Sequence, residues 1–102
     1  MMNEVPSFSL AQTAHLLSIP GMGSKKLVRF LRQEGILLAG DIPRQRYVER
    51  GYFCVIQQQY PKADGAVTLR AVTRVREKGV VFLRRRLDDY LQQYMERQML
   101  AR

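Results

Sequence analysis

The sequence has few of the residues from which catalytic and metal sites are built. It contains one histidine, His15, and one cysteine, Cys54, which lie far apart in the chain. A single cysteine cannot form an intramolecular disulfide, so nothing favours an oxidising compartment, and we expect Cys54 to be a small buried apolar residue. One histidine and one distant cysteine cannot build the usual zinc site. We therefore predict no metal site.

No catalytic constellation is visible either. His15 has no carboxylate or serine placed by the sequence to work with it. The adjacent Asp88 and Asp89 point in different directions on a helix, which makes them poor metal partners. The glycine spacing matches no phosphate-binding loop. We predict a binding protein that has no cofactor and is not an enzyme.

Long hydrophobic runs and targeting signals are also missing. The longest apolar stretch, Gly79–Leu83, is far too short to span a bilayer, so no membrane partner is expected. Residues 1–6 have neither the basic region nor the apolar run of a signal peptide, which predicts a cytoplasmic location. The length of 102 residues fits one domain over 1–102, with a core over 8–88 and a C-terminal helix extension over 89–102.

Acidic residues are few compared with basic ones. Asp and Glu total 9 against 17 Lys and Arg, a formal net charge of +8. Such a surface favours polyanions as partners.

Two short helices joined by a tight turn are predicted near the N-terminus. Ser9 can cap a helix over 10–17, which the Pro and Gly residues of 18–23 interrupt. Ser24 can cap a second helix over 25–34, which Gly35 ends. This pair is a helix-turn-helix candidate.

The second predicted helix has an apolar face and a basic face. Arg and Gln suit the major groove of DNA, because their planar groups can pair bidentately with guanine and adenine. The alternative is an ordinary solvated helix surface. The apolar face consists of Leu27, Val28, Phe30 and Leu31, and the basic face of Lys25, Arg29, Arg32 and Gln33.

A short helix and a β-hairpin are predicted next. Asp41 can cap a helix over 44–50 that Gly51 closes. Aromatic and β-branched residues over 52–60 and 66–75 favour two strands, and the turn residues of 61–65 join them. Arg70 and Arg74 share one face of the second strand and could lie along a phosphate backbone, although exposed strand arginines also serve solubility.

Helical periodicity extends over about 79–100. The apolar stripe includes Tyr90 and Tyr94 and continues to Met99, so the far end either forms a homodimer contact or packs on the parent domain. The basic run 84–86 is open to two interpretations. It could clamp phosphate, or Arg84 and Arg85 could pair with the aspartates four residues later.

These elements predict an α+β fold, mainly α. Their order is that of a winged helix-turn-helix variant, with two N-terminal helices, a short third helix, a β-hairpin wing and a long C-terminal helix. In that arrangement the second helix enters the major groove of double-stranded DNA and the wing touches the backbone or minor groove. The predicted DNA-binding residues are Lys25, Lys26, Arg29, Arg32, Gln33, Arg44, Gln45, Arg46, Lys62, Arg70, Arg74, Arg76 and Lys78.

Three segments resemble a known family, the carboxy-terminal KilAC domain of phage antirepressor proteins. Residues 27–37 look like the family run Leu-Phe-x-Trp-Leu-Arg-x-x-Gly-Tyr-Leu, and residues 43–53 look like Pro-Thr-Gln-x-Tyr-x-x-x-Gly-x-Phe. Residues 73–79 are similar to Thr-x-Val-Thr-x-Lys-Gly, and the resemblance covers about 10–87. Arg44 and Arg76 stand where the family patterns have threonine.

The resemblance implies a phage or prophage DNA-binding domain that regulates the lysogenic switch in the cytoplasm of a bacterial host. It places the helix with Arg29 and Arg32, and the helix with Gln45 and Arg46, at DNA. Family members usually carry this domain behind a separate amino-terminal domain. The main rival function is a protein-binding antagonist that sequesters a repressor through the apolar C-terminal helix. RNA binding is disfavoured, because aromatic stacking motifs of the recognised kind are missing.

Overall fold

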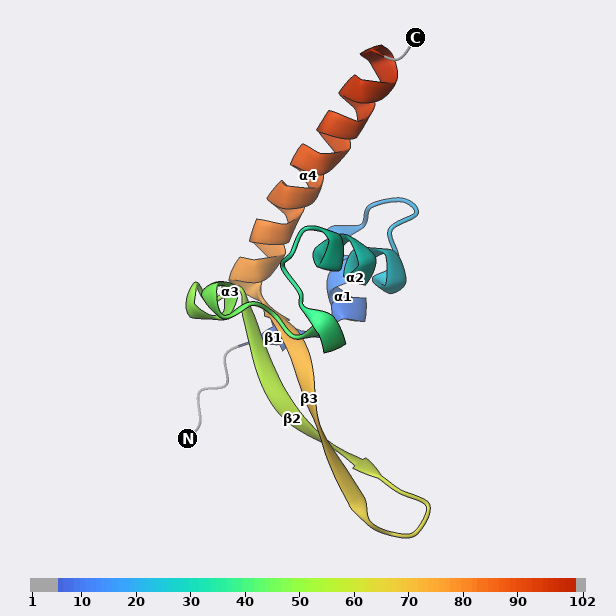
Figure 1. Cartoon of the computed structure of the whole chain (residues 1–102), viewed down its shortest axis with the longest axis vertical. Helices are drawn as coiled ribbons and strands as arrows, with labels where there is room; N and C mark the ends of the chain where they lie inside the picture. The colour runs from blue at the N-terminus through green and yellow to red at the C-terminus, as the bar shows by residue number, and fades with distance from the viewer. Residues whose placement is uncertain (1–5, 101–102) are drawn as a thin grey trace.

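A computed structural model describes residues 6–100 of the chain. The fold is mixed α+β and mainly helical, and Figure 1 shows two long projections that leave a small globular part in opposite directions. One projection is the hairpin of β2 and β3, and the other is the C-terminal helix α4. The extents of the molecule, 59 × 34 × 23 Å, reflect this elongated shape.

Within residues 6–100, the sheet consists of three antiparallel strands. Strands β2 (Phe53–Pro61) and β3 (Val67–Arg76) form the predicted hairpin, with Phe53 opposite Val75 at its base. Strand β1 (Ser7–Phe8) adds to the other edge of β3, so the order is β1-β3-β2. Strand β1 was not predicted from the sequence, because two residues are too few to show an alternation.

The two N-terminal helices form as the sequence predicts, except at one cap. Helix α1 (Leu10–Leu17) begins with a reciprocal capping box, in which the side chains of Ser9 and Gln12 each accept a backbone N–H of the other residue. Helix α2 (Ser24–Gln33) is capped by Gly23 instead of Ser24, which is already its first helical residue. The Gly23 carbonyl accepts the first helical hydrogen bond, from Leu27.

The connection after α2 also differs from the prediction. Asp41 does not cap the third helix, since it ends the short 3-10 helix η1 (Ala39–Asp41) with a left-handed φ of 61°. A single β-bridge between Leu37 and Pro43 closes this segment into a small loop. Helix α3 (Gln45–Glu49) follows, with Arg44 at its N-cap, one residue shorter at each end than predicted.

The core lies where the helices meet the base of the hairpin. Phe53 and Val75 are fully buried there, and Tyr52 stacks on Phe82 with ring centroids 4.4 Å apart. The N-terminal half of α4 (Glu77–Leu100) closes this core. Among residues 6–100, the other fully buried apolar side chains are Leu17, Leu27, Leu31, Ile36, Leu83 and Leu87.

Helix α4 changes character along its length. It follows β3 without a loop and closely approaches Tyr52, the residue before β2, at Gly79, where an added Cβ would lie 2.0 Å from the Tyr52 carbonyl oxygen. Tyr90 still packs edge-on against Phe30, with ring centroids 5.1 Å apart. The outer part of α4 projects from the globular part in Figure 1, and residues 92–100 are all exposed, Met99 to 74%. Within residues 6–100, these outer turns of α4 therefore do not pack on the rest of the chain.

Candidate nucleic-acid interface

Helix α2 separates its apolar and basic residues as the sequence predicts. Leu27, Phe30 and Leu31 are buried against the core. The opposite side of the helix carries the predicted basic face, whose residues are all exposed and include the neighbouring Lys26. These side chains are Lys25, Lys26, Arg29, Arg32 and Gln33.

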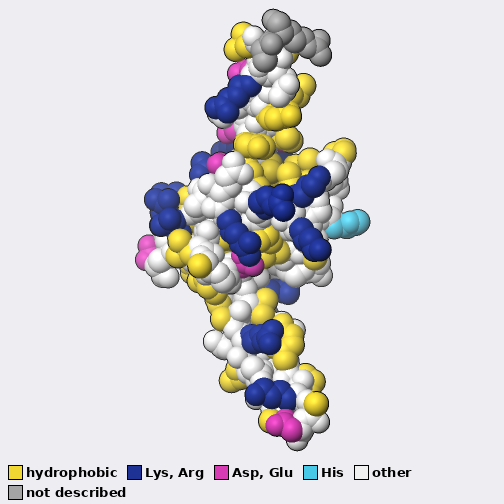
Figure 2. Space-filling view, turned by 45° about the vertical axis from the view of Figure 1, so that its right-hand side comes forward, with side chains coloured by type: hydrophobic (Ala, Val, Ile, Leu, Met, Phe, Trp, Pro, Cys, Tyr) yellow, Lys and Arg dark blue, Asp and Glu magenta, His cyan; other side chains and the backbone are white. Residues whose placement is uncertain are grey.

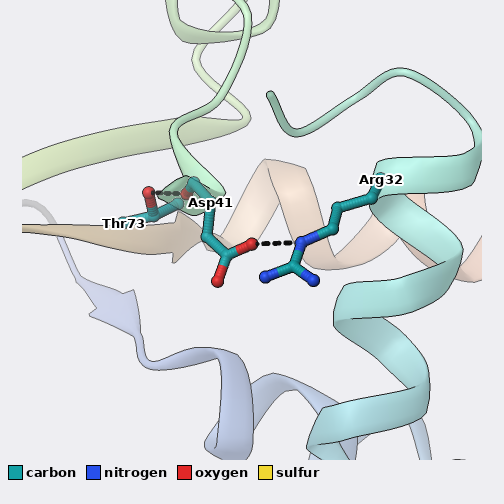
Figure 3. Close-up of polar contacts among 3 residues, drawn as sticks. All are labelled: Arg32, Asp41 and Thr73. Atoms are coloured by element: carbon teal, nitrogen blue, oxygen red, sulfur yellow. Dashed lines mark hydrogen bonds and ion pairs between the residues drawn. The ribbon is translucent and has the colours of Figure 1, made fainter. Parts of the chain in front are cut away.

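An ion pair organises one end of this face. The Arg32 Nε donates a hydrogen bond of 2.6 Å to the Asp41 carboxylate, and Figure 3 shows the pair bridging α2 and η1. The hydrogen bond and the negative charge of Asp41 raise the pKa of Arg32 above its ordinary value, so the guanidinium stays charged. Sequence analysis missed this contact, because the residues lie on different elements and Asp41 reads as a helix cap.

An open groove runs along the same face. It lies between the start of α1, the exposed side of α2 and Asp41, and basic side chains border it. A groove with this lining can admit an anionic ligand. Its lining residues are Leu10, Ala11, Ser24, Lys25, Val28, Arg29, Arg32 and Asp41.

Of the predicted DNA-binding residues around α3, one is hydrogen-bonded within the fold and two are exposed without such a bond in residues 6–100. Arg44 donates from Nε to the Gly35 carbonyl, so it ties α3 to the end of α2. Arg46 is exposed, with its guanidinium 5.0 Å from the centre of the Tyr47 ring, and Gln45 is exposed beside it. Gln45 and Arg46 thus remain available to a ligand, whereas Arg44 has a role within the fold.

The predicted DNA-binding residues of the hairpin also include side chains that contact the rest of the fold and others that are exposed. Arg74 donates to the carbonyl and the hydroxyl of Ser7, which fastens β1 to β3. Arg76 is only half-exposed, and its Nε is buried without a hydrogen-bond partner in residues 6–100. Arg70 lies further out, 5.3 Å from the Tyr60 ring centre, and Lys62 is exposed in the loop at the tip. Lys78 is exposed at the start of α4.

Figure 2 shows how these charges are distributed. Lys and Arg side chains gather on one face of the globular part, and others continue along the hairpin on the same side of the molecule. The structure thus brings basic residues of several elements to one long surface.

The run 84–86 follows neither interpretation in full. Arg84 donates to the carbonyls of Leu16 and Leu17, at the C-terminal end of α1, and Arg86 lies 3.9 Å from a Glu34 carboxylate oxygen. Within residues 6–100, no ion pair joins Arg84 to Asp88 or Arg85 to Asp89. Arg84 therefore contacts the C-terminal end of α1, and Arg86 lies near the C-cap residue of α2. These partners are too far away in the sequence for helical periodicity to predict them.

The remaining candidate residues form no further site. His15 is exposed on α1, and Cys54 is half-buried on β2 instead of fully buried as predicted. Over the described range 6–100, no three His, Cys, Asp or Glu side chains are grouped to hold a metal ion. In the same range, no helix has the length and apolarity needed to cross a membrane.

Comparison with known proteins identifies the family. The model of the phage antirepressor protein KilAC domain matches residues 2–90, which is most of the chain. The chain belongs to this family of phage regulatory proteins. The resemblance seen in the three sequence segments is thereby confirmed.

Two curated relatives agree with this assignment. The SPbeta prophage-derived protein YoqD of Bacillus subtilis (strain 168), named as a candidate antirepressor, is 38% identical over 77 residues, which cover 72% of this chain and 29% of YoqD. The protein kilA of Escherichia phage P1 is 34% identical over 73 residues, covering 68% of this chain and 27% of kilA. The chain thus matches less than a third of either relative. No solved structure matches it significantly.

Proposed function

We propose that this chain is a DNA-binding transcriptional regulator of phage or prophage origin, of the winged helix-turn-helix type. In this proposal α2 enters the major groove, the hairpin acts as the wing, and the protein works as a non-enzymatic single domain in the cytoplasm of the bacterial host. The observation that carries the proposal is the exposed basic face of α2, backed by a buried apolar face. Family membership supports a regulatory role.

The number of free cations sets the expected salt dependence. Exposed basic side chains with no hydrogen-bond or ion-pair partner among residues 6–100 are the ones available to phosphates, and contacts from about six of them would give a slope of log affinity against log salt near −5. The proposed contacts of this kind are Lys25, Lys26, Arg29, Arg46, Lys62 and Arg70.

The test is an electrophoretic mobility shift titration of the whole chain on duplex DNA at several salt concentrations. The variant Lys25→Gln with Arg29→Gln should reduce the steepness of the slope by about 2. The matched control is Arg85→Gln with Arg97→Gln on α4, which removes the same charge outside the proposed interface and should leave the slope unchanged. Failure of the unmodified chain to bind duplex at about 50 mM salt would refute the proposal.

The outer part of α4 supports a second candidate function. Tyr94, Met95, Met99 and Leu100 are exposed on turns that project from the globular part, and such residue types suit adaptable protein interfaces. The chain would then sequester a repressor through α4, or pair α4 with a second copy. A complex with a repressor of the same phage that survives about 1 M salt supports sequestration, since apolar contacts resist screening. Light scattering that shows a monomer at high micromolar concentration removes the homodimer.

A further inference from the structure

The pair of Arg32 and Asp41 is unusual for a surface that only attracts phosphate. Asp41 places a negative charge on the border of the basic groove, where it would repel a phosphate backbone. The pair is also accessible, because the Arg32 side chain is 56% exposed and that of Asp41 is 35% exposed. A role of Arg32 other than binding phosphate would explain why Asp41 lies beside it.

The backbone around Asp41 fixes the position of its carboxylate. The Asp41 carbonyl accepts a hydrogen bond of 2.6 Å from the hydroxyl of Thr73, a buried residue of β3, and Figure 3 shows this bond on the other side of Asp41 from Arg32. The Asp41 N–H donates to the Leu38 carbonyl. Asp41 also adopts a left-handed φ of 61°, which only a few residue types other than glycine tolerate. The backbone of Asp41 is thus positioned by its hydrogen bond with β3.

The geometry of the ion pair leaves the end of the guanidinium free. Arg32 uses Nε for Asp41 and makes no other hydrogen bond within residues 6–100, so the N–H groups of both Nη atoms have no partner there. Arg32 lies on the same helical face as Lys25 and Arg29, because it follows them by seven and three residues, close to two turns and one turn. The free Nη groups therefore belong to the surface proposed to meet DNA.

Two parallel N–H donors on a fixed plane match one base in particular. Guanine presents O6 and N7 as adjacent acceptors in the major groove, and arginine pairs with them bidentately. Holding the guanidinium before binding reduces the side-chain entropy lost on contact. An acid that positions an arginine thus favours reading a base over a loose phosphate contact.

We propose that Arg32 reads a guanine through its two Nη groups, and that Asp41 is the positioning residue that aims it. This inference rests on the proposed DNA binding and names the base that α2 recognises. It also predicts opposite effects on two kinds of DNA. Removing Asp41 adds a net positive charge, which favours non-specific duplex, while it loosens the arginine that recognises the specific one.

The experiment starts from a preferred duplex, selected from random sequences with the unmodified chain. Dissociation constants for this duplex and for a scrambled one are then measured for the unmodified chain, Asp41→Gly and Arg32→Lys. Glycine suits the left-handed backbone at position 41 and removes the aspartate side chain with its carboxylate. The control is Asp89→Asn on α4, which changes the net charge equally. Thermal unfolding of each variant checks that it is folded.

The expected result is a loss of discrimination without a loss of general affinity. Asp41→Gly and Arg32→Lys should each reduce the preference for the selected duplex, up to the about 5- to 150-fold that one bidentate base contact contributes. Asp41→Gly should bind the scrambled duplex as well as or better than the unmodified chain. Asp89→Asn should keep the full preference. Replacing the recognised guanine by 7-deazaguanine should weaken binding of the unmodified chain more than binding of Arg32→Lys, because lysine lacks the planar pair of donors.

Two outcomes would overturn the inference while leaving DNA binding intact. In the first, no 7-deazaguanine substitution in the selected duplex has an effect that depends on Arg32. In the second, Asp41→Gly keeps the full preference, whether its affinity for both duplexes is unchanged or rises by the same factor. Absence of any duplex binding by the unmodified chain would instead refute the proposed function itself.

Discussion

Replacing Gly79 by alanine tests the closest approach in the structure. The added Cβ would lie 2.0 Å from the Tyr52 carbonyl oxygen and 2.9 Å from a Val75 methyl carbon, whereas ordinary contacts begin near 3.4 Å. Helix α4 would have to move away from the start of β2 by about 1.4 Å, a shift that core packing resists. The stacking of Phe82 on Tyr52 and the burial of Leu83 would be disturbed with it.

The magnitude follows from two opposing effects. Overpacking against backbone costs about 1–3 kcal/mol or more, and the lost packing of the neighbouring side chains adds to it. Alanine recovers about 1 kcal/mol through its higher helix propensity. We expect the free energy of unfolding to fall by about 2–4 kcal/mol, which lowers the unfolding midpoint by about 10–25 °C in a domain of this size.

Urea unfolding followed by circular dichroism measures this loss. The control is Gly23→Ala, because an added Cβ at Gly23 meets no atom within 4 Å and its φ of −86° suits any residue. This control should cost no more than about 1 kcal/mol, the usual difference between residues at a helix N-cap. If Gly79→Ala proved as mild as Gly23→Ala, the close contact between α4 and the Tyr52 backbone would be refuted.

Three further predictions concern other parts of the chain. Ser9→Ala should lower the free energy of unfolding by about 1 kcal/mol, because it removes half of the capping box of α1, and urea unfolding would contradict this by showing no change. Thr73→Val should cost about 1–3 kcal/mol in the same assay, because the Asp41 carbonyl loses its buried donor, and a neutral result would argue against that hydrogen bond. Deleting residues 92–102 should leave the thermal midpoint within a few degrees, since residues 92–100 are all exposed, and a large drop would show that the end of α4 supports the fold.

The sequence was sufficient to predict the elements whose signals are local. The period of α2 and the turn chemistry of 61–65 depend on neighbouring residues, and the helix and the hairpin both formed close to their predicted bounds. The cap of α2 was misassigned, because Gly23 and Ser24 are both acceptable N-cap residues and only the backbone conformation decides between them. Strand β1 was missed because its pairing with β3 spans most of the chain.

The candidate site was predictable in its residue types but not in its internal contacts. The basic face of α2 follows from spacing alone. The roles of Asp41, Arg74 and Arg84 depend on partners that lie 9, 67 and 67 or 68 residues away. No helical or strand periodicity connects positions so far apart, so these residues looked in the sequence like a cap, a phosphate contact and half of a local ion pair.

These contacts change what the net charge of +8 means for binding. Arg44, Arg74 and Arg84 donate hydrogen bonds to backbone carbonyls of other elements, so binding a phosphate would require each to give up a bond within the fold. Lys25 and Arg29 have no such bond among residues 6–100 and can meet an anion without that cost. The salt dependence of binding should therefore follow the free cations of α2 and the hairpin rather than the total number of basic residues. If the slope instead matched the total number of basic residues, the arginines that join the elements would have to break their hydrogen bonds within the fold when the ligand binds.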